Sequence, residues 1–286
     1  MRGGFLRVGG RLVHHVRGGA GSPPVLFVHG LGSAGYLEWR FNLPVVARTH
    51  GVTAPDLPGF GRSERPADGY GIPLFADVID EFLAAQDEPP ALVGSSMGGR
   101  VALEVALRRP EAVRKLVLVN ALGVVRPNLQ PFYPLVLVPR VGEGMLGLMR
   151  EALHRLPPTT IRRYARRFLG VAGDVERLLD ESFLAGMREM HAAEGYPHAY
   201  ISTVRALARR DAYRVDTLLA RLAATGLPVQ LIWGEGDRLL PVERAREAHR
   251  RLPGARLDVI PGAGHSPQAE RPDEFNRALE DFLASA

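Results

Sequence analysis

A short glycine-rich segment about a third of the way along the chain constrains its fold more than any other feature. Residues 94–98 read Gly-Ser-Ser-Met-Gly, a G-x-S-x-G pattern centred on Ser96. An apolar run at residues 91–93 precedes the pattern, and a stretch of helical character at residues 100–109 follows it. A serine at a sharp strand-to-helix turn needs small residues two positions before and after it, and its hydroxyl then projects above a sheet. The pattern therefore predicts a nucleophilic serine at the end of a strand.

The pattern alone does not decide the matter, because 32 of the 286 residues are glycine and chance matches arise easily. A nucleophilic serine also needs a base and an acid, and the chain supplies both in the order Ser96, Asp237, His265. Asp237 follows the apolar run 229–233, and His265 follows a second apolar run at 257–260. Both residues are therefore expected after strands, at the carboxyl edge where open α/β sheets bind their ligands.

A second glycine-rich loop supplies groups that can stabilise negative charge. Residues 29–32 read His-Gly-Leu-Gly and follow the apolar run 25–28. A loop of this kind directs a backbone N–H group at an oxyanion that develops on the substrate. We expect the two donors to be the backbone N–H groups of Leu31 and of Met97, which follows the serine at the start of a helix.

Five segments in a fixed order resemble the α/β-hydrolase fold family in its capped, serine esterase form. The matching segments are 29–32 (HGLG), 56–63 (DLPGFGRS), 94–99 (GSSMGG), 234–237 (GEGD, with Pro241 behind it) and 264–265 (GH). They span nearly the whole chain, with a weaker stretch between about residues 122 and 211. Within the family, the chain is similar to carboxylesterases and to meta-cleavage-product hydrolases.

The resemblance implies a role for each of the three separated residues. Ser96 is the nucleophile, His265 is the base that takes and returns its proton, and Asp237 orients the imidazole. Glu235 is the nearest rival for the acid, but the G-x-x-D spacing favours Asp237. Some relatives carry the acid after the strand that follows the nucleophile's helix; this chain has Asn120 there, which has no charge.

Several other polar residues near these loops are interpreted as scaffold. They are His29, Asp56, Arg62 and Ser63, together with His14 and His15 in a predicted opening hairpin. Because neighbouring residues of a strand point to opposite faces, we expect at most one of His14 and His15 to face the interior.

Strands alternate with helical stretches over most of the chain, which predicts an α/β fold with a mostly parallel sheet flanked by helices. Length alone does not choose between one large domain and two small ones. The block at 122–211 breaks the rhythm, because it shows helical stretches without a convincing strand between them; these are near residues 143–156, 159–169, 175–191 and 200–209. We therefore expect a body formed by 1–121 and 212–286, and a helical cap, 122–211, inserted after the sixth strand.

Composition excludes several classes of function. The chain has no cysteine, which removes disulfides and thiolate chemistry, and its nine histidines show no zinc-binding spacing. We expect neither a metal nor a cofactor. The formal charge of +5 comes from scattered arginines, so no nucleic-acid partner is expected. No apolar run reaches the length of about 18 residues that a membrane span needs, and the start lacks a signal-like stretch, so we expect a cytoplasmic protein.

These observations predict a cofactor-independent serine hydrolase that cleaves esters of small to medium hydrophobic acyl groups. An apolar cap suits such small-molecule substrates. A carbon–carbon bond hydrolase acting on ring-fission products is the alternative, although Ser95 and Ser266 stand where such enzymes usually have asparagine and tryptophan. A ligand receptor on the same fold, and lactone or peracid side activities, also stay open, as does the choice between monomer and homodimer.

Overall fold

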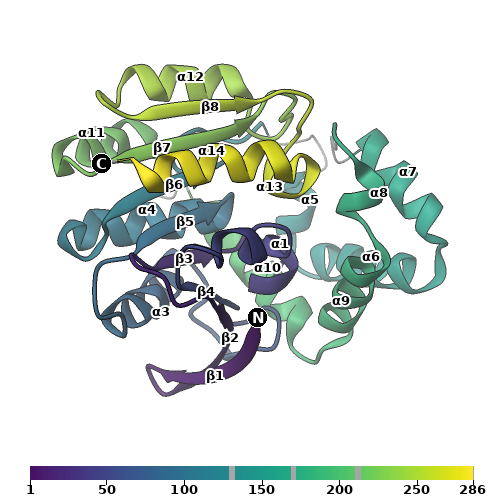
Figure 1. Ribbon diagram of the computed structural model, residues 1–286. Helices are drawn as coiled ribbons and strands as arrows, with labels where there is room; N and C mark the ends of the chain where they lie inside the picture. Colours follow the sequence, from purple (N-terminus) through teal and green to yellow (C-terminus); the bar gives the residue numbers. More distant parts are fainter. Residues whose placement is uncertain (129–132, 169–171, 210–213, 286) are drawn as a thin grey trace.

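A single mixed sheet forms the centre of the molecule. The computed structural model describes residues 1–128, 133–168, 172–209 and 214–285, and within them eight strands pair in the order β1-β2-β4-β3-β5-β6-β7-β8 (Figure 1). The strands are β1 (Arg2–Val8), β2 (Arg11–Gly18), β3 (Val25–Val28), β4 (Val52–Pro55), β5 (Ala91–Ser95), β6 (Lys115–Val119), β7 (Val229–Gly234) and β8 (Arg256–Ile260). Strand β2 pairs antiparallel with β1 and with β4, whereas β4, β3 and β5 to β8 run parallel.

Helices cover both faces of this sheet. The helices before residue 122 and after residue 213 are α1 (Gly35–Trp39), α2 (Leu43–Val46), α3 (Ile72–Ala84), α4 (Met97–Arg108), α11 (Val215–Thr225), α12 (Val242–Arg250), α13 (Pro267–Glu270) and α14 (Pro272–Ala284), with a 3₁₀ turn at Pro110–Ala112. One apolar core lies between the sheet and α3, α4, α11 and α12, and a second lies between the opposite face and α1, α2 and α14. Every residue of β5 and β6 is buried, as expected for central parallel strands covered on both faces.

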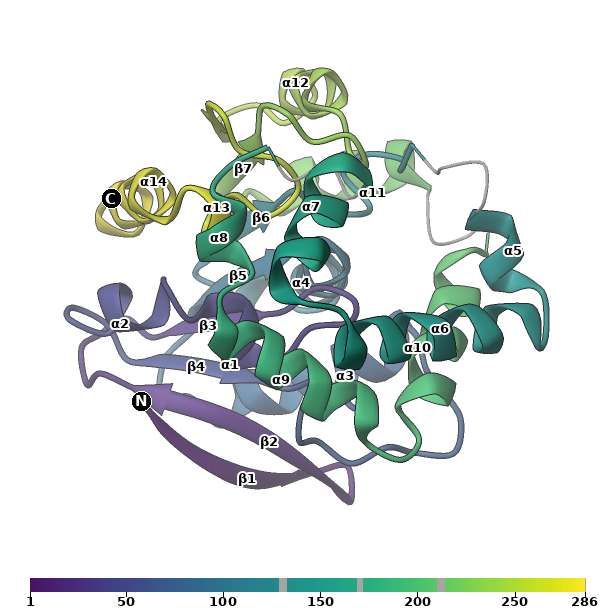
Figure 2. The same ribbon diagram turned by 90° about the vertical axis from the view of Figure 1, so that its right-hand side faces the viewer.

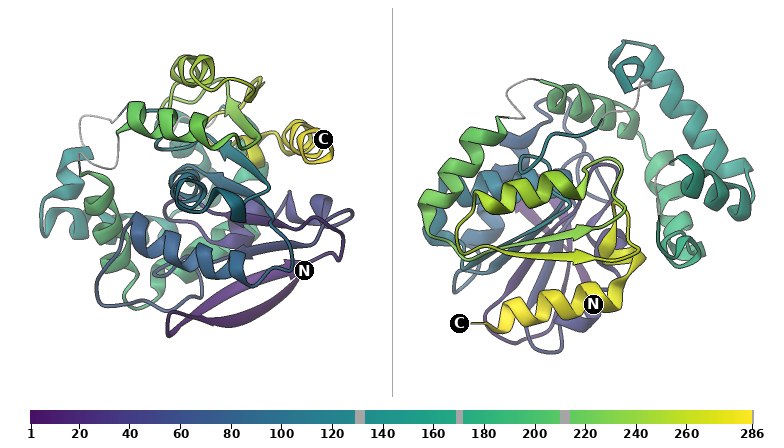
Figure 3. Two further views of the ribbon diagram at one scale, coloured as in Figure 1. Left: turned by 90° about the vertical axis from the view of Figure 1, so that its left-hand side faces the viewer. Right: turned by 90° about the horizontal axis from the view of Figure 1, so that it is seen from above.

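A group of helices between β6 and α11 lies over the carboxyl ends of the parallel strands (Figures 2 and 3). These helices are α5 (Tyr133–Leu137), α6 (Val141–Arg155), α7 (Pro158–Phe168), α8 (Val175–Leu178), α9 (Glu181–Ala192) and α10 (Tyr196–Leu207). The predicted α/β class with a helical insertion is confirmed. The boundaries at 121/122 and 211/212 stay a prediction, and residues 169, 211 and 212 lie outside the described residues.

The single helix predicted at 175–191 is wrong. The structure has α8 and α9 there instead, because two aspartates each begin a new helix. Asp174 accepts the backbone N–H of Arg177 at 3.0 Å, and Asp180 accepts that of Phe183 at 2.7 Å. Side-chain acceptors at these positions satisfy N–H groups that the first turn leaves free, so each aspartate marks a helix start.

The expectation that at most one of His14 and His15 faces the interior is also wrong, since both side chains are buried. Strand β2 is covered on both faces. The imidazole of His14 hydrogen-bonds the carboxylate of Asp56 at 2.9 Å, and His15 packs edge-on against Phe82 of α3 on the other side. Both histidines therefore belong to the scaffold, as expected, but on opposite buried faces.

No helix within the described ranges combines the length and the apolar character that crossing a bilayer requires.

Candidate active site

Ser96 lies at the turn between β5 and α4 in a strained backbone conformation. Its φ and ψ are 51° and −115°, outside the regions that residues with a side chain normally adopt. Such a conformation costs about 1–3 kcal/mol and persists only where the surrounding structure fixes it. The neighbouring glycines make the turn possible: a Cβ at Gly98 would collide with the carbonyl oxygens of Val28 and His29, and one at Gly94 would collide with that of Gly98.

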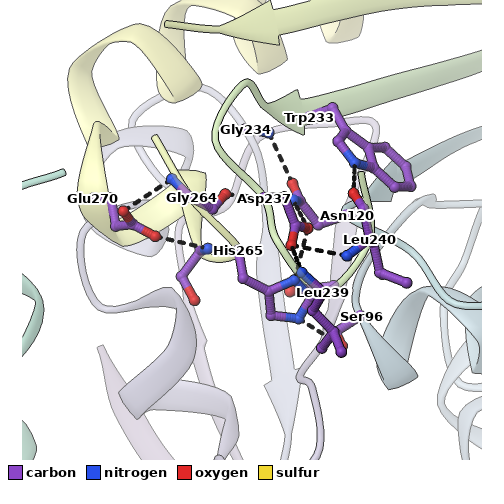
Figure 4. A network of polar contacts seen from close by, with 12 residues as sticks. Ser96, Asn120, Trp233, Gly234, Asp237, Leu239, Leu240, Gly264, His265 and Glu270 are labelled. Carbon is purple, nitrogen blue, oxygen red and sulfur yellow. Dashed lines mark hydrogen bonds and ion pairs between the residues drawn. The ribbon is translucent and has the colours of Figure 1, made fainter. Parts of the chain in front are cut away.

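The structure brings Ser96, His265 and Asp237 together from three different loops (Figure 4). The Nε2 atom of His265 lies 3.0 Å from the hydroxyl oxygen of Ser96. Its Nδ1 atom lies 2.8 Å from Oδ2 of Asp237. Because a carboxylate oxygen only accepts, Nδ1 donates, and Nε2 is then free to accept the proton of the serine hydroxyl. Glu235, the rival acid, lies elsewhere and accepts the N–H of Gly262 at 3.4 Å.

The carboxylate of Asp237 is held in place from several sides. Its Oδ1 atom accepts the backbone N–H groups of Leu239 and Leu240 at 2.8 and 2.9 Å. Burial by itself would raise the pKa of Asp237, but the charge and hydrogen bond of His265, together with the other donors, hold that pKa below its ordinary value. The group is therefore a fixed negative charge behind the imidazole.

The pairing of Asp237 with His265 also changes the pKa of the imidazole, which it raises. Burial lowers the pKa of His265, but the negative charge of Asp237 and its hydrogen bond outweigh burial and leave that pKa above the ordinary 6.5. Glu38 and Glu270 contribute further in the same direction. The arrangement therefore favours proton transfer from a hydroxyl to His265.

Asn120, considered in the sequence only for its lack of charge, contacts the acid directly. Its side-chain amide donates to Oδ2 of Asp237 and, at 3.4 Å, to the carbonyl of Gly264. Its carbonyl oxygen accepts the backbone N–H of Gly234 at 3.1 Å. Asn120 thus joins the ends of β6 and β7 to the loop before His265. The sequence signal for it is its position directly after an apolar strand.

His29 fixes the loop that carries Leu31. Its Nδ1 atom donates to the carbonyl of Gly30 at 2.7 Å, and its Nε2 atom accepts the N–H of Leu57 at 2.9 Å. Burial lowers the pKa of His29, so the ring is neutral and serves both bonds. The loop lies against the strained turn, because a Cβ on Gly30 would be 3.4 Å from Cβ of Ser96. The role of the Leu31 and Met97 N–H groups as oxyanion donors stays a prediction.

A carboxylate that the sequence did not single out lies beside this loop. Glu38 of α1 accepts the side-chain amide of Gln268 at 3.0 Å, and the same amide lies 3.3 Å from the hydroxyl of Ser95. A Cβ on Gly30 would be 3.5 Å from Oε1 of Glu38, so this oxygen lies within about 7 Å of Cβ of Ser96. The site therefore carries a negative charge besides Asp237.

The loop after β4 is joined by hydrogen bonds to the strands and helices around the site. Asp56 accepts the N–H of Gly35 at 2.7 Å and that of Arg62 at 2.9 Å, in addition to its bond with His14. The hydroxyl of Ser63 donates to the carbonyl of Asp56. These bonds join β2, α1 and the 56–63 loop. Among the described residues, no cluster of three or more histidines and carboxylates is placed to hold a metal ion.

Comparison with known proteins agrees with this geometry. The family model of the alpha/beta hydrolase fold matches residues 23–272. The chain belongs to the α/β hydrolase family. Membership of this family supports a hydrolase activity.

Several known proteins and solved structures are similar to this chain. An uncharacterized protein of Mycobacterium tuberculosis is 33% identical over 92% of this chain and 76% of its own length. A 2-hydroxymuconate semialdehyde hydrolase of Pseudomonas sp. is 29% identical over 94% of this chain and 89% of its own. The crystal structure of a meta-cleavage product hydrolase has a TM-score of 0.78 and 25% identity, covering 99% and 98% of the two chains. An esterase of Thermogutta terrifontis, with a TM-score of 0.72, 22% identity and coverage of 99% and 98%, shares the fold.

Proposed function

We propose that this α/β hydrolase cleaves neutral carboxylic esters through an acyl-enzyme formed on Ser96. The observation that carries the proposal is the unbroken chain of hydrogen bonds from Asp237 through His265 to the serine hydroxyl, at 2.8 and 3.0 Å. A free serine hydroxyl is too weak an acid to attack an ester at neutral pH, and this chain provides the base that it needs.

In the first half of the reaction, the hydroxyl oxygen of Ser96 attacks the ester carbonyl while its proton passes to Nε2 of His265. The carbonyl oxygen becomes an oxyanion, for which the N–H groups of Leu31 and Met97 are the proposed donors. The intermediate collapses, the bond between the carbonyl carbon and the alcohol oxygen breaks, and His265 returns its proton to the leaving alcohol.

Water completes the cycle. His265 takes a proton from a water molecule as that water attacks the acyl carbon, and the second intermediate expels the oxygen of Ser96. His265 then returns the proton to the serine, and a carboxylic acid leaves. Asp237 stays ionised throughout and stabilises the imidazolium that forms in each half.

The charge near the site favours a neutral ester over an anionic substrate. Glu38 places a carboxylate oxygen within about 7 Å of Ser96 Cβ. A substrate carboxylate bound at a similar distance from Glu38 would be disfavoured by roughly 2 kcal/mol at an effective dielectric constant of about 20. An uncharged acyl chain carries no such penalty, and the helices over the strand ends are the proposed cap that binds it.

A carbon–carbon bond hydrolase is the second candidate, because hydrolases named for ring-fission products are similar to this chain over almost all of its length. They include the semialdehyde hydrolase of Pseudomonas and the meta-cleavage product hydrolase with a TM-score of 0.78. The same triad would serve such a reaction. Two positions next to the triad differ from the usual pattern of those enzymes, since Ser95 and Ser266 replace asparagine and tryptophan.

One experiment separates these functions. The purified protein and its Ser96→Ala variant are incubated with p-nitrophenyl esters of increasing acyl length and with a ring-fission dienoate. We expect ester hydrolysis by the wild-type protein, none by the variant, and labelling of Ser96 by a fluorophosphonate. Faster consumption of the dienoate than of every ester would favour the second candidate, and equal turnover by the variant would rule out Ser96.

A further inference from the structure

A buried carboxylate next to the proposed base accepts four backbone N–H groups. Glu270 of α13 has only 2% of its surface exposed. Its Oε2 atom accepts the N–H of Gly264 at 2.9 Å, and its Oε1 atom accepts that of Ser266 at 3.0 Å (Figure 4). These two N–H groups belong to the residues on either side of His265. The backbone that carries the imidazole is therefore fixed by a single side chain.

The other two donors come from the segment that leads into α8. Oε2 of Glu270 also accepts the N–H of Ala172 at 2.9 Å and that of Gly173 at 2.7 Å. We call residues 172–178, which end with α8, the cap foot. A buried carboxylate is stable only when its oxygens are hydrogen-bonded, and here the cap foot provides half of the donors.

The cap foot packs closely on α13, which follows the loop of the base, and on the loop of the acid. A Cβ on Gly173 would lie 2.7 Å from Cβ and 3.0 Å from the carbonyl oxygen of Glu270. A Cβ on Gly236, the residue before Asp237, would lie 3.1 Å from Cβ of Ala172. The same short segment thus contacts α13, which directly follows the histidine loop, and the aspartate loop at once.

A second buried side chain ties the far end of the cap foot to the body. Arg40, which follows α1, donates from Nη2 to the carbonyls of Arg177 and Leu178 at 3.1 and 2.8 Å. The cap foot is therefore held at both ends, by Arg40 and by Glu270.

We propose that Glu270 is a positioning residue that holds the His265 loop in its reactive place only while the cap foot is docked. The inference rests on the proposed role of His265 as the base. When the cap foot lifts, Glu270 loses two of its four donors and meets water, and the N–H groups of Gly264 and Ser266 lose a fixed acceptor. Displacements of about 1 Å at a reacting group cost on the order of a hundredfold in rate. Cap position and base alignment are thereby linked.

The test measures how fast a small fluorophosphonate labels Ser96, a reaction that needs the aligned base but no knowledge of the substrate. Glu270→Gln removes the negative charge and replaces one accepting oxygen with an NH2 group, which cannot accept N–H groups. We expect labelling to slow at least about tenfold. The acidic limb of its pH profile should also move to lower pH, because the negative charge of Glu270 raises the pKa of His265. Glu274→Gln, at an exposed carboxylate of α14, is the matched control and should label like the wild type.

Gly173→Ala tests the link from the cap side without altering any charge or any residue of the triad. Its methyl group cannot fit against Glu270, so the cap foot must move away and labelling should again slow about tenfold. Gly144→Ala, on α6 with open space around the new methyl group, is the matched control. Thermal unfolding shows whether each variant is folded.

Arg40→Gln loosens the other end of the cap foot and gives a second measurement if Gly173→Ala does not fold. Slow labelling in Glu270→Gln, together with slow labelling in folded Gly173→Ala or folded Arg40→Gln, supports the inference. Labelling at the wild-type rate in folded Gly173→Ala or in folded Arg40→Gln overturns it, since Glu270 would then act within the histidine loop alone. If the wild-type protein itself neither labels at Ser96 nor hydrolyses esters, the proposed function has failed instead.

Discussion

Asn120 and His265 donate to the same oxygen of Asp237. The asparagine amide and Nδ1 of the imidazole both point at Oδ2, while Oδ1 accepts two backbone N–H groups. In a buried site, a carboxylate with this many donors has one orientation, and that orientation determines where the imidazole lies. Asn120 therefore takes part in aligning the triad although it carries no charge.

Replacing Asn120 by alanine should lower kcat by about tenfold and destabilise the fold by about 1–3 kcal/mol, because Oδ2 of Asp237 loses a donor and the N–H of Gly234 loses its acceptor. Steady-state kinetics with a p-nitrophenyl ester and urea unfolding measure the two effects. An unchanged kcat in a destabilised variant would mean that Asn120 serves the fold only.

Removing the charge of Asp237 has a predicted effect on both rate and pH dependence. His265 acts as a base only when neutral, so activity is present above its pKa and is lost as the pH falls through that value. Asp237 raises this pKa above 6.5, and the acidic limb of kcat/KM in the wild type is therefore expected above pH 6.5. In Asp237→Asn the limb should move to lower pH, and kcat should fall by roughly three to four orders of magnitude.

Glu235→Gln is the control for this prediction, because Glu235 is close in sequence but bonds Gly262 instead of His265. It should keep both the rate and the position of the limb. A limb that stays in place in Asp237→Asn would show that Asp237 does not set the basicity of His265.

The sequence predicted the parts of the site that rest on local patterns. A glycine-flanked serine after an apolar run, and an aspartate and a histidine after two further runs, place three side chains at one sheet edge because parallel strands all end there. Glu38 and Gln268 were missed because their partners lie far away in sequence, and so do the two donors of Glu270 in the cap foot. Gln268 and Glu38, for example, are 230 positions apart. No local pattern carries such a contact.

The break between α8 and α9 was missed for a different reason, which is local. The apolar spacing of residues 175–191 continues through the junction, and so it predicted one helix. Asp180 interrupts it, because its carboxylate caps a new first turn more favourably than the interior of a helix accommodates it. Periodicity reports the buried face of a segment, and capping side chains decide where each helix starts.

Substrate charge gives a direct test of Glu38. The preference for p-nitrophenyl butyrate over the anionic mono-p-nitrophenyl succinate should fall about tenfold in Glu38→Gln, since the variant removes the like charge near Ser96. The ratio of kcat/KM values for the two esters, measured at low salt, is the readout. Glu274→Gln should keep the wild-type ratio. If the ratio is the same in Glu38→Gln, the carboxylate does not face the bound acyl group.

His191 of α9 should make the fold sensitive to acid independently of the triad. Its side chain is buried beside Tyr196, with ring centroids 4.6 Å apart, and burial, followed by the charges of His154 and Arg150, lowers the pKa of His191 to about 4. Between pH 6.5 and 4 the unfolded chain therefore binds a proton that the folded chain does not. The free energy of unfolding should fall by about 1.4 kcal/mol per pH unit in this window, or about 2 kcal/mol at pH 5, and the loss is absent above pH 6.5.

His191→Gln removes this proton-binding difference, whereas His198→Gln, at an exposed histidine of α10, leaves it in place. Urea unfolding at pH 7 and pH 5 gives the loss of stability for each protein. Because His15 and His29 are also buried with a lowered pKa, part of the acid sensitivity persists in every variant. The expected result is a loss about 2 kcal/mol smaller in His191→Gln than in the wild type and in His198→Gln. Equal losses in all three proteins would mean that His191 is protonated in the folded state at pH 5.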